Sequence, residues 1–403
     1  MKSNEESRSA EEAAAERIEN QLGALETADV LRRRWLASDA VRNGFPPMTR
    51  DEYLKLLDTN MPMLLEIAAR IGVKDEEAEQ FIREGKELLA KVPHKSDFDD
   101  PGLVWVLQMF LNEITAVCSD LSLPFHGGIA IGATPLAAIN ARQMRAFCDA
   151  SFIELTISLM RLCDLVAKAM ANAIEHTQVD GKLRLHFHPV NIRKRLQTET
   201  WILDEWRRII RLFATHGYPP RGVGPAPEGA AKSTRVLLTE AMELWVIAHE
   251  VCHHVLKHGT DDSTAKNLGP FEEERQADLL SRILLMGIAK RRNTLDNEIL
   301  VSGAGAALFL GATDLVERAK AVLDTGNDAI LPNDHHPLLH DRLEAIHNSD
   351  VQAFGERGLR FGIFRLLFVN ILDIVWELLK PSFEEMHRKG VQPFRPTHWP
   401  NLV

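Results

Sequence analysis

The chain has 403 residues, 45% of them hydrophobic, and a formal net charge of −10. This length allows two or three structural units with a substantial core. The acidic balance argues against general nucleic-acid binding, which needs a basic face. Four cysteines, at positions 118, 148, 163 and 252, show no CxxC spacing. They are therefore expected to be reduced, mostly buried thiols in a reducing compartment.

The first third of the chain is expected to be helical. Helices are predicted at 9–37, 52–71, 75–91 and 102–121, with a polar, proline-bounded linker at 93–101. The arginine-rich run 31–35 inside the first helix is interpreted as a solvated face. Residues 127–134 are predicted to form a glycine-rich turn.

The middle of the chain mixes strand and helix patterns. The alternation of Ile153, Leu155 and Ile157 predicts a strand over 152–157, with one long helix over 134–173 as the alternative. A second strand is expected at 182–188 and an amphipathic helix at 198–215. A loop rich in Gly and Pro at 217–232 precedes a long apolar-periodic segment, 234–258, which is predicted to be helical.

The sequence His249-Glu250-Val251-Cys252-His253 lies inside that last helix. Residues four apart share one helix face, so His249 and His253 can hold one metal ion. Glu250 then lies where it can take a proton from a bound water, which makes a zinc hydrolase the leading interpretation. The alternative is a core helix with hydrogen-bonded histidines.

The end of this helix carries two more histidines. His254 and His258 are also four apart, but they lack a glutamate at the right offset and are expected to be polar-face residues. Gly259 suits a helix C-cap.

A second acidic motif follows at 274–278, Glu-Arg-Gln-Ala-Asp. Pro270 suits a helix start, and glutamates favour the first turn of a helix. Glu274 can supply the third ligand that a catalytic zinc site needs. Asp278, one turn on, can hydrogen-bond a ligating histidine and fix its tautomer. The alternative is a set of surface glutamates that stabilise the helix dipole.

HExxH followed by ExxAD resembles the gluzincin endopeptidases of the CAAX-prenyl-protease and HtpX type. The segment 334–346 is similar to the late motif of that family, a His-Pro followed by Arg, here His336, Pro337 and Arg342. The resemblance implies that Arg342, or less favourably His336, faces the substrate carbonyl oxygen. For Arg342 a surface ion pair at a helix start is the alternative. The family's Asn-Ala and strand correspond more weakly to 140–141 and 152–157, because about ninety residues separate that strand from His249.

These observations predict a mainly α (α+β) fold, with a helical zincin-like core, a small β-sheet and a helical N-terminal extension. The expected divisions are 1–95, 96–350 with an insertion near 159–233, and 351–403. The apolar segments 300–310 and 359–379 are interpreted as buried helices, and neither a signal peptide nor a membrane span is expected.

The expected function is a Zn2+-dependent peptidase in the cytoplasm. Its substrate is expected to be a protein or peptide, in particular a regulatory target. A non-peptidase zinc hydrolase and an inactive metal-bound scaffold remain alternatives. The sequence leaves the oligomeric state and the identity of the substrate open.

Overall fold

The computed structural model describes residues 23–42, 49–59, 96–146, 149–179, 182–218, 227–259, 269–295, 297–330 and 337–395, together with isolated positions elsewhere. The described chain divides into two compact units. Unit 1 comprises Met1–Leu136, Ala141–Ile157 and Ile247–Asn267, and unit 2 comprises Ala137–Asn140, Ser158–Val246 and Leu268–Val403.

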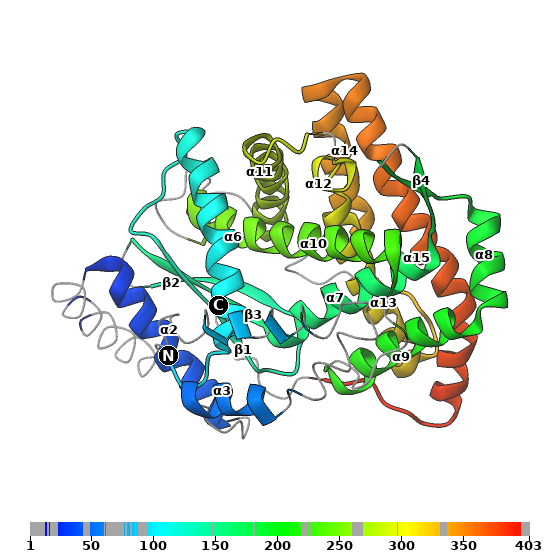
Figure 1. Ribbon diagram of the computed structural model, residues 1–403, viewed down its shortest axis with the longest axis horizontal. Helices are drawn as coiled ribbons and strands as arrows, with labels where there is room; N and C mark the ends of the chain where they lie inside the picture. Colours follow the sequence, from blue (N-terminus) through cyan, green and yellow to red (C-terminus); the bar gives the residue numbers. More distant parts are fainter. Residues whose placement is uncertain are drawn as a thin grey trace. The chain divides into compact units, whose positions relative to one another are not determined.

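Unit 1 is built on a three-stranded sheet with the order β1-β3-β2 (Figure 1). Its strands are β1 (Ile129–Thr134), β2 (Ala141–Arg145) and β3 (Ser151–Thr156). β3 pairs in parallel with β1 and antiparallel with β2, so β2 forms one edge. The predicted strand over 152–157 is confirmed, and the alternative of one helix over 134–173 is wrong. The predicted glycine-rich turn at 127–134 is also wrong over most of its length, because Ile129–Thr134 is a fully buried strand.

The described helices of unit 1 include α2 (Ala24–Arg42), α3 (Arg50–Thr59) and α6 (Pro101–Asp120). α2 and α6 both pack against β1. α6 confirms the predicted helix at 102–121. Its segment Gly102–Asp120 is, by length and composition, apolar enough to cross a membrane, a test that core helices of soluble proteins also pass. Much of the helices predicted at 9–37, 52–71 and 75–91 lies outside the described residues.

The interpretation of 31–35 as a solvated face is wrong at Arg32, whose side chain is 2% exposed. Its guanidinium donates to both carboxylate oxygens of Asp99, at 2.8 and 2.7 Å. The space for it comes from Gly132 on β1, where an added Cβ would lie 2.0 Å from Arg32 Nη1. A buried cation needs such a partner, and the partner lies 67 residues away.

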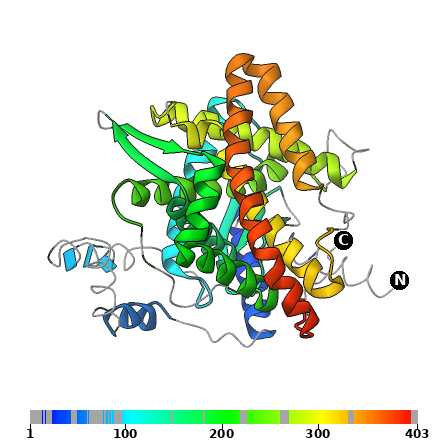
Figure 2. The same ribbon diagram turned by 90° about the vertical axis from the view of Figure 1, so that its right-hand side faces the viewer.

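Unit 2 is mainly helical. Its described helices are α7 (Ile157–Ala173, whose first residue belongs to unit 1), α8 (Pro189–Thr198), α9 (Thr200–His216), α11 (Pro270–Arg291), α12 (Glu298–Val301), α13 (Ala304–Thr325), α14 (Leu339–Phe354) and α15 (Glu356–Arg388). A hairpin of β4 (Glu175–Val179) and β5 (Lys182–His186) accompanies them. α15 packs against α13 and α14, and α11 packs against α14 (Figure 2).

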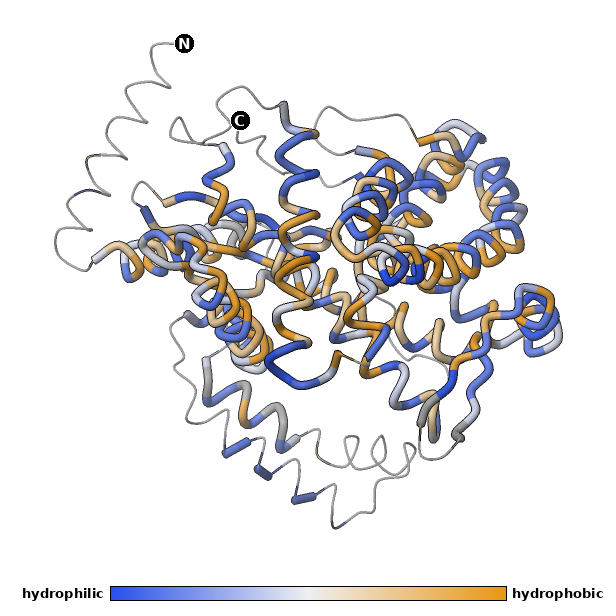
Figure 3. The backbone as a smooth tube through the Cα atoms, turned by 90° about the horizontal axis from the view of Figure 1, so that it is seen from above, coloured by the Kyte–Doolittle hydropathy of each residue, from blue (hydrophilic) through white to orange (hydrophobic). Residues whose placement is uncertain are grey.

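The core of unit 2 explains why these segments are helices. Hydrophobic and hydrophilic residues alternate in short stretches along the helical tubes, as expected when each helix buries one face (Figure 3). Large side chains at 206, 213, 245, 368 and 383 are almost completely buried. The segment 359–379 lies in α15 and is helical as predicted, and 300–310 lies in α12 and α13 except for the turn at 302–303 between them. The mainly α (α+β) class is thus confirmed, whereas the boundaries at 95/96 and 350/351 stay predictions.

Candidate metal centre

The HExxH motif lies near the C-terminal end of α10 (Gly229–Val255). The helix forms here because 27 residues run without proline while an apolar stripe recurs along one side. Leu238, Leu244 and Ala248 of that stripe are all fully buried. The predicted helix over 234–258 is confirmed up to Val255.

His249 and His253 direct the same ring atom toward each other. Their Nε2 atoms lie 3.1 Å apart, and the ring centroids are 4.8 Å apart with the planes at 78°. Two nitrogens bound to one tetrahedral zinc ion, each at about 2.0–2.1 Å, lie about 3.3 Å from each other. The spacing of the two imidazoles therefore suits a single ion. Glu250, between them in sequence, is 8% exposed.

Glu274 lies in the second turn of α11, which begins with Pro270 after Gly269. The ligand atoms of His249, His253 and Glu274 all lie within 4.8 Å of one another. Two imidazoles and one carboxylate form the donor set of a catalytic zinc site that keeps one position open. The group therefore fits a metal ion by donor type and by spacing.

Glu272, two positions before Glu274, behaves differently from it. Glu272 accepts hydrogen bonds from the guanidinium of Arg275 three residues on, the Nε donor at 2.7 Å. These bonds hold its pKa below the ordinary value. Glu274 is more buried, at 9% exposure. The structure thus separates one candidate ligand from a surface ion pair.

Asp278 and Arg342 form a bidentate ion pair between α11 and α14. Arg342 Nε donates to Oδ2 and Nη2 to Oδ1 of Asp278, each at 2.7 Å. Arg342 Nη2 also lies 3.6 Å from Glu274, and its guanidinium lies 5.6 Å from the ring centroid of Trp245. Because its side chain is only 10% exposed, this is not the surface ion pair that the sequence offered as an alternative.

The two-point contact with Asp278 fixes the plane of the Arg342 guanidinium and leaves its charge beside Glu274. A direct bond from Asp278 to a ligating histidine stays a prediction, as does the contact of Arg342 with a substrate oxygen. His336, the other basic residue predicted near the site, lies outside the described residues.

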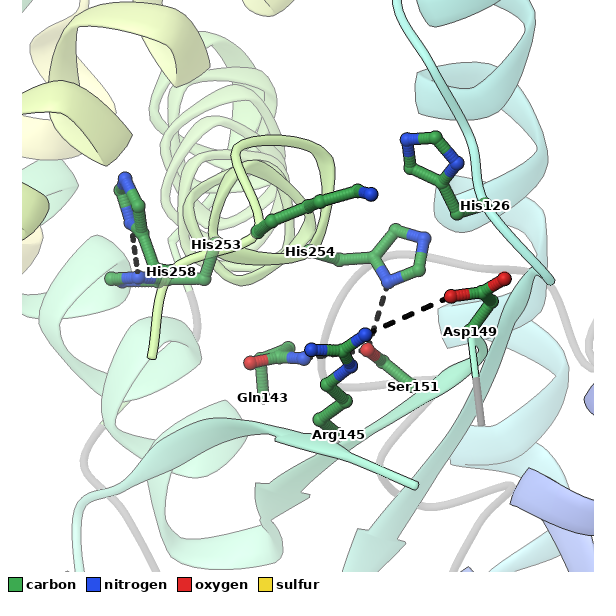
Figure 4. A pocket seen from close by; sticks show the side chains of 9 residues that line it. His126, Gln143, Arg145, Asp149, Ser151, His253, His254 and His258 are labelled. Atoms are coloured by element: carbon green, nitrogen blue, oxygen red, sulfur yellow. Dashed lines mark hydrogen bonds and ion pairs between the residues drawn. The ribbon is translucent and has the colours of Figure 1, made fainter. Parts of the chain in front are cut away.

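The prediction that His254 and His258 are polar-face residues is wrong, since they are 5% and 7% exposed. For His258 the reason is that α10 ends at Val255, before that position. Lys257 adopts a positive φ of 55°, so the left-handed residue that ends the helix is Lys257 rather than Gly259. The chain then turns back and places His258 Nδ1 2.9 Å from His253 Nδ1 (Figure 4).

His254 connects the same helix end to the sheet of unit 1. Its Nδ1 lies 2.8 Å from Ser151 Oγ on β3, and Ser151 Oγ also accepts a 2.6 Å hydrogen bond from Gln143 on the edge strand β2. Burial, with a smaller contribution from His126, lowers the pKa of His254 to about 4. His254 is therefore neutral near pH 7, and its Nδ1 can accept the serine proton.

Comparisons of the chain with protein-family models, with curated proteins and with solved structures give no match.

Proposed function

We propose that the chain is a zinc-dependent endopeptidase of the gluzincin type. The observation that carries this proposal is the arrangement of His249 and His253, whose Nε2 atoms face each other at 3.1 Å on one helix that also carries Glu250. Glu274 supports it because it completes a three-residue donor set within 4.8 Å. Zinc is favoured over other ions because imidazole and carboxylate with one open position is its usual catalytic set.

A zinc ion held there would lower the pKa of a coordinated water and polarise a carbonyl group. Glu250 would take the proton of the attacking water and pass it to the leaving amine as the peptide bond breaks. Glu250 is buried, at 8% exposure, which would limit the access of bulk water to this transfer. Arg342, held by Asp278, would place positive charge near the carbonyl oxygen as that oxygen becomes negative.

A peptide is the favoured substrate because β2, an edge strand of the sheet, lies on the side of the HExxH end of α10. β2 is the outer strand, and its residue Gln143 is linked through Ser151 to His254 on α10. An extended peptide can add to such an edge through main-chain hydrogen bonds. A small ester or amide would have no use for that strand.

We place the enzyme inside the cell and expect a regulatory protein as its substrate. Cys118 and Cys163 are buried thiols outside any disulfide. Burial raises the pKa of Cys118 to about 11, so this thiol is unreactive near neutral pH. Thiols of this kind suit a reducing compartment.

The test compares the wild type with Glu250→Gln for zinc content, melting temperature and cleavage of a peptide library. We expect zinc and melting temperature near wild type, with turnover reduced by at least about 10²-fold, because glutamine cannot act as a base. Glu356→Gln, an exposed position at the start of α15, is the matched control. Equal cleavage by Glu250→Gln would overturn the mechanism. Activity on small esters or amides but not on peptides would favour the non-peptidase hydrolase, and zinc binding with no hydrolysis would favour a scaffold.

A further inference from the structure

The end of α10 is a tight turn that returns the chain toward the HExxH motif. The N–H of His258 donates to the carbonyl of His253 at 3.0 Å, and the N–H of Lys257 donates to the carbonyl of His254 at 3.1 Å. With Lys257 in the left-handed region, these two bonds define a Schellman motif. The turn is therefore a fixed piece of backbone structure.

This turn changes which side chains can meet. On a continuous helix, residues five apart point about 140° away from each other, so His258 could not reach His253. The left-handed Lys257 reverses the chain and brings the two Nδ1 atoms to 2.9 Å (Figure 4). The rings meet edge to face, with centroids 5.0 Å apart. A lysine in this conformation is disfavoured relative to glycine or asparagine, so the turn is kept at an energetic cost.

The contact has a consequence for how His253 can bind a metal. A neutral imidazole carries its proton on one nitrogen, and a ligand nitrogen must be the other one. Nε2 of His253 faces His249 and belongs to the candidate ligand set. The proton must then lie on Nδ1, where it needs an acceptor. His258 Nδ1 lies at hydrogen-bond distance from that atom.

We infer that His258 is a positioning residue, which accepts the Nδ1–H of His253 and so fixes the tautomer and ring orientation in which His253 binds zinc. Lys257 acts through it by holding the turn. The inference rests on the proposed metal site and goes beyond it, since partners of ligating histidines are more often carboxylates or backbone carbonyls. Here the partner comes from the end of the same helix.

The first experiment measures zinc affinity by competition with a chromophoric chelator, and the visible spectrum of the cobalt(II)-loaded protein. His258→Leu removes the acceptor at similar size, and we expect the zinc dissociation constant to rise by about 10–100-fold. His258→Asn places an amide oxygen near the position of Nδ1. Its zinc dissociation constant should therefore stay within about threefold of wild type, and its cobalt(II) spectrum should match that of wild type. His340→Ala, a histidine with an 87% exposed side chain on α14, controls for loss of surface metal binding.

A second pair tests the turn without changing His258. Lys257→Asn removes the charge but tolerates the left-handed conformation, whereas Lys257→Val is β-branched and opposes it. We expect Lys257→Asn to bind zinc like wild type and Lys257→Val to weaken binding toward the level of His258→Leu. In the double variant with His258→Leu, Lys257→Val should add little further loss of zinc affinity, because both substitutions break the same contact between His258 and His253.

The outcomes separate the inference from the proposed function. A wild-type protein that binds no zinc would overturn the metal site itself. Zinc binding by wild type, with an unchanged dissociation constant and cobalt spectrum in His258→Leu, would overturn only the role of His258. If His258→Leu loses its helical circular dichroism, the Lys257 pair decides, and equal affinities in Lys257→Asn and Lys257→Val would count against the inference.

Discussion

Two of the three candidate ligands, His253 and Glu274, have their neighbouring side chains placed in different ways. His253 is supported from its own helix, by a residue five positions on whose backbone turn is local. Glu274 has Arg342 beside it, which Asp278 holds from 64 residues away in sequence across α11 and α14. A local support depends on one turn, whereas a remote support depends on the packing of the whole unit. Damage to the first should therefore reduce metal affinity alone, and damage to the second should also reduce stability.

The largest effect is expected from removing the proposed carboxylate ligand, Glu274. Glu274→Ala should weaken zinc binding by at least about 10³-fold, because one of three protein ligands is lost from a site whose binding energy they share. Glu272→Ala and Glu273→Ala should keep wild-type affinity. Metal analysis after dialysis against a chelator checks all three, and full zinc retention by Glu274→Ala would remove this residue from the ligand set.

The next effect concerns the remote support. Arg342→Ala leaves Asp278, which is fully buried, without its bidentate cation. We expect the free energy of unfolding to fall by about 3 kcal/mol, the scale for breaking a buried ion pair. Arg342→Lys keeps the charge but not the two-point contact, and should recover only part of this loss. Arg275→Ala, which removes a surface pair, is the control and should cost less than about 1 kcal/mol.

The same variant tests the proposed catalytic contact. If Arg342 also stabilises the developing oxyanion, kcat per folded molecule should fall by about 10²–10³-fold with KM nearly constant. Active-site titration alongside thermal melting separates this from instability.

Asp278→Asn should lower zinc affinity or activity by about 10–100-fold if Asp278 orients a ligand, and a silent substitution would limit it to a structural role.

Glu243 on α10 contrasts with Asp278. It is a partly buried carboxylate, and the charged neighbours that shift its pKa are acids rather than an arginine. Burial, then Asp164 and Glu240, raise its pKa to about 8. The folded chain therefore binds a proton that the unfolded chain releases above its ordinary pKa of about 4.3. Stability should fall as pH rises from about 4.3 to about 8.

Glu243→Gln should flatten that pH dependence and make the protein more stable than wild type at pH 8, by on the order of 2 kcal/mol. Urea unfolding of both proteins at pH 5, 6, 7 and 8 measures it. The same slope in both proteins would show that Glu243 does not titrate in this range.

The smallest effect is expected at the local turn. Lys257→Gly should stabilise the zinc-free protein by about 0.5 kcal/mol, because relief of the left-handed strain outweighs the added backbone freedom of the unfolded chain. Zinc affinity should not change. Chemical unfolding of the apo protein measures the difference, and a destabilised Lys257→Gly would mean that the lysine side chain contributes contacts larger than its backbone strain.

The sequence predicted local features well. The helix carrying His249 and His253, the start of α11 at Pro270 and the alternation that marks β3 all depend on neighbours within a few residues. The ligand set of His249, His253 and Glu274 stays a prediction that the geometry supports. Periodicity could not show where α10 ends, because Lys257 has no intrinsic preference for the left-handed region. His258 was therefore assigned to the wrong environment.

Long-range pairing could not be predicted from one sequence. Nothing local marks Arg342 as the partner of Asp278, or Gln143 as the donor to Ser151. The glycine-rich segment before β2 was misassigned for the same reason. A glycine usually indicates a turn, yet Gly132 lies in the middle of β1. Only the side chain of Arg32, which packs against it, explains the glycine there.

The contact of Arg32 with Gly132 and Asp99 has a practical consequence for shortening the chain. Residues 1–95 were predicted to be a helical extension, and a protein starting at residue 96 would follow from that boundary. Such a protein would keep Asp99, whose side chain is 5% exposed, but would lose its only described cation. It would also leave an empty space above Gly132 where the guanidinium lies. A buried carboxylate without a partner and a void beside β1 both favour unfolding, so a stable shortened protein should retain α2.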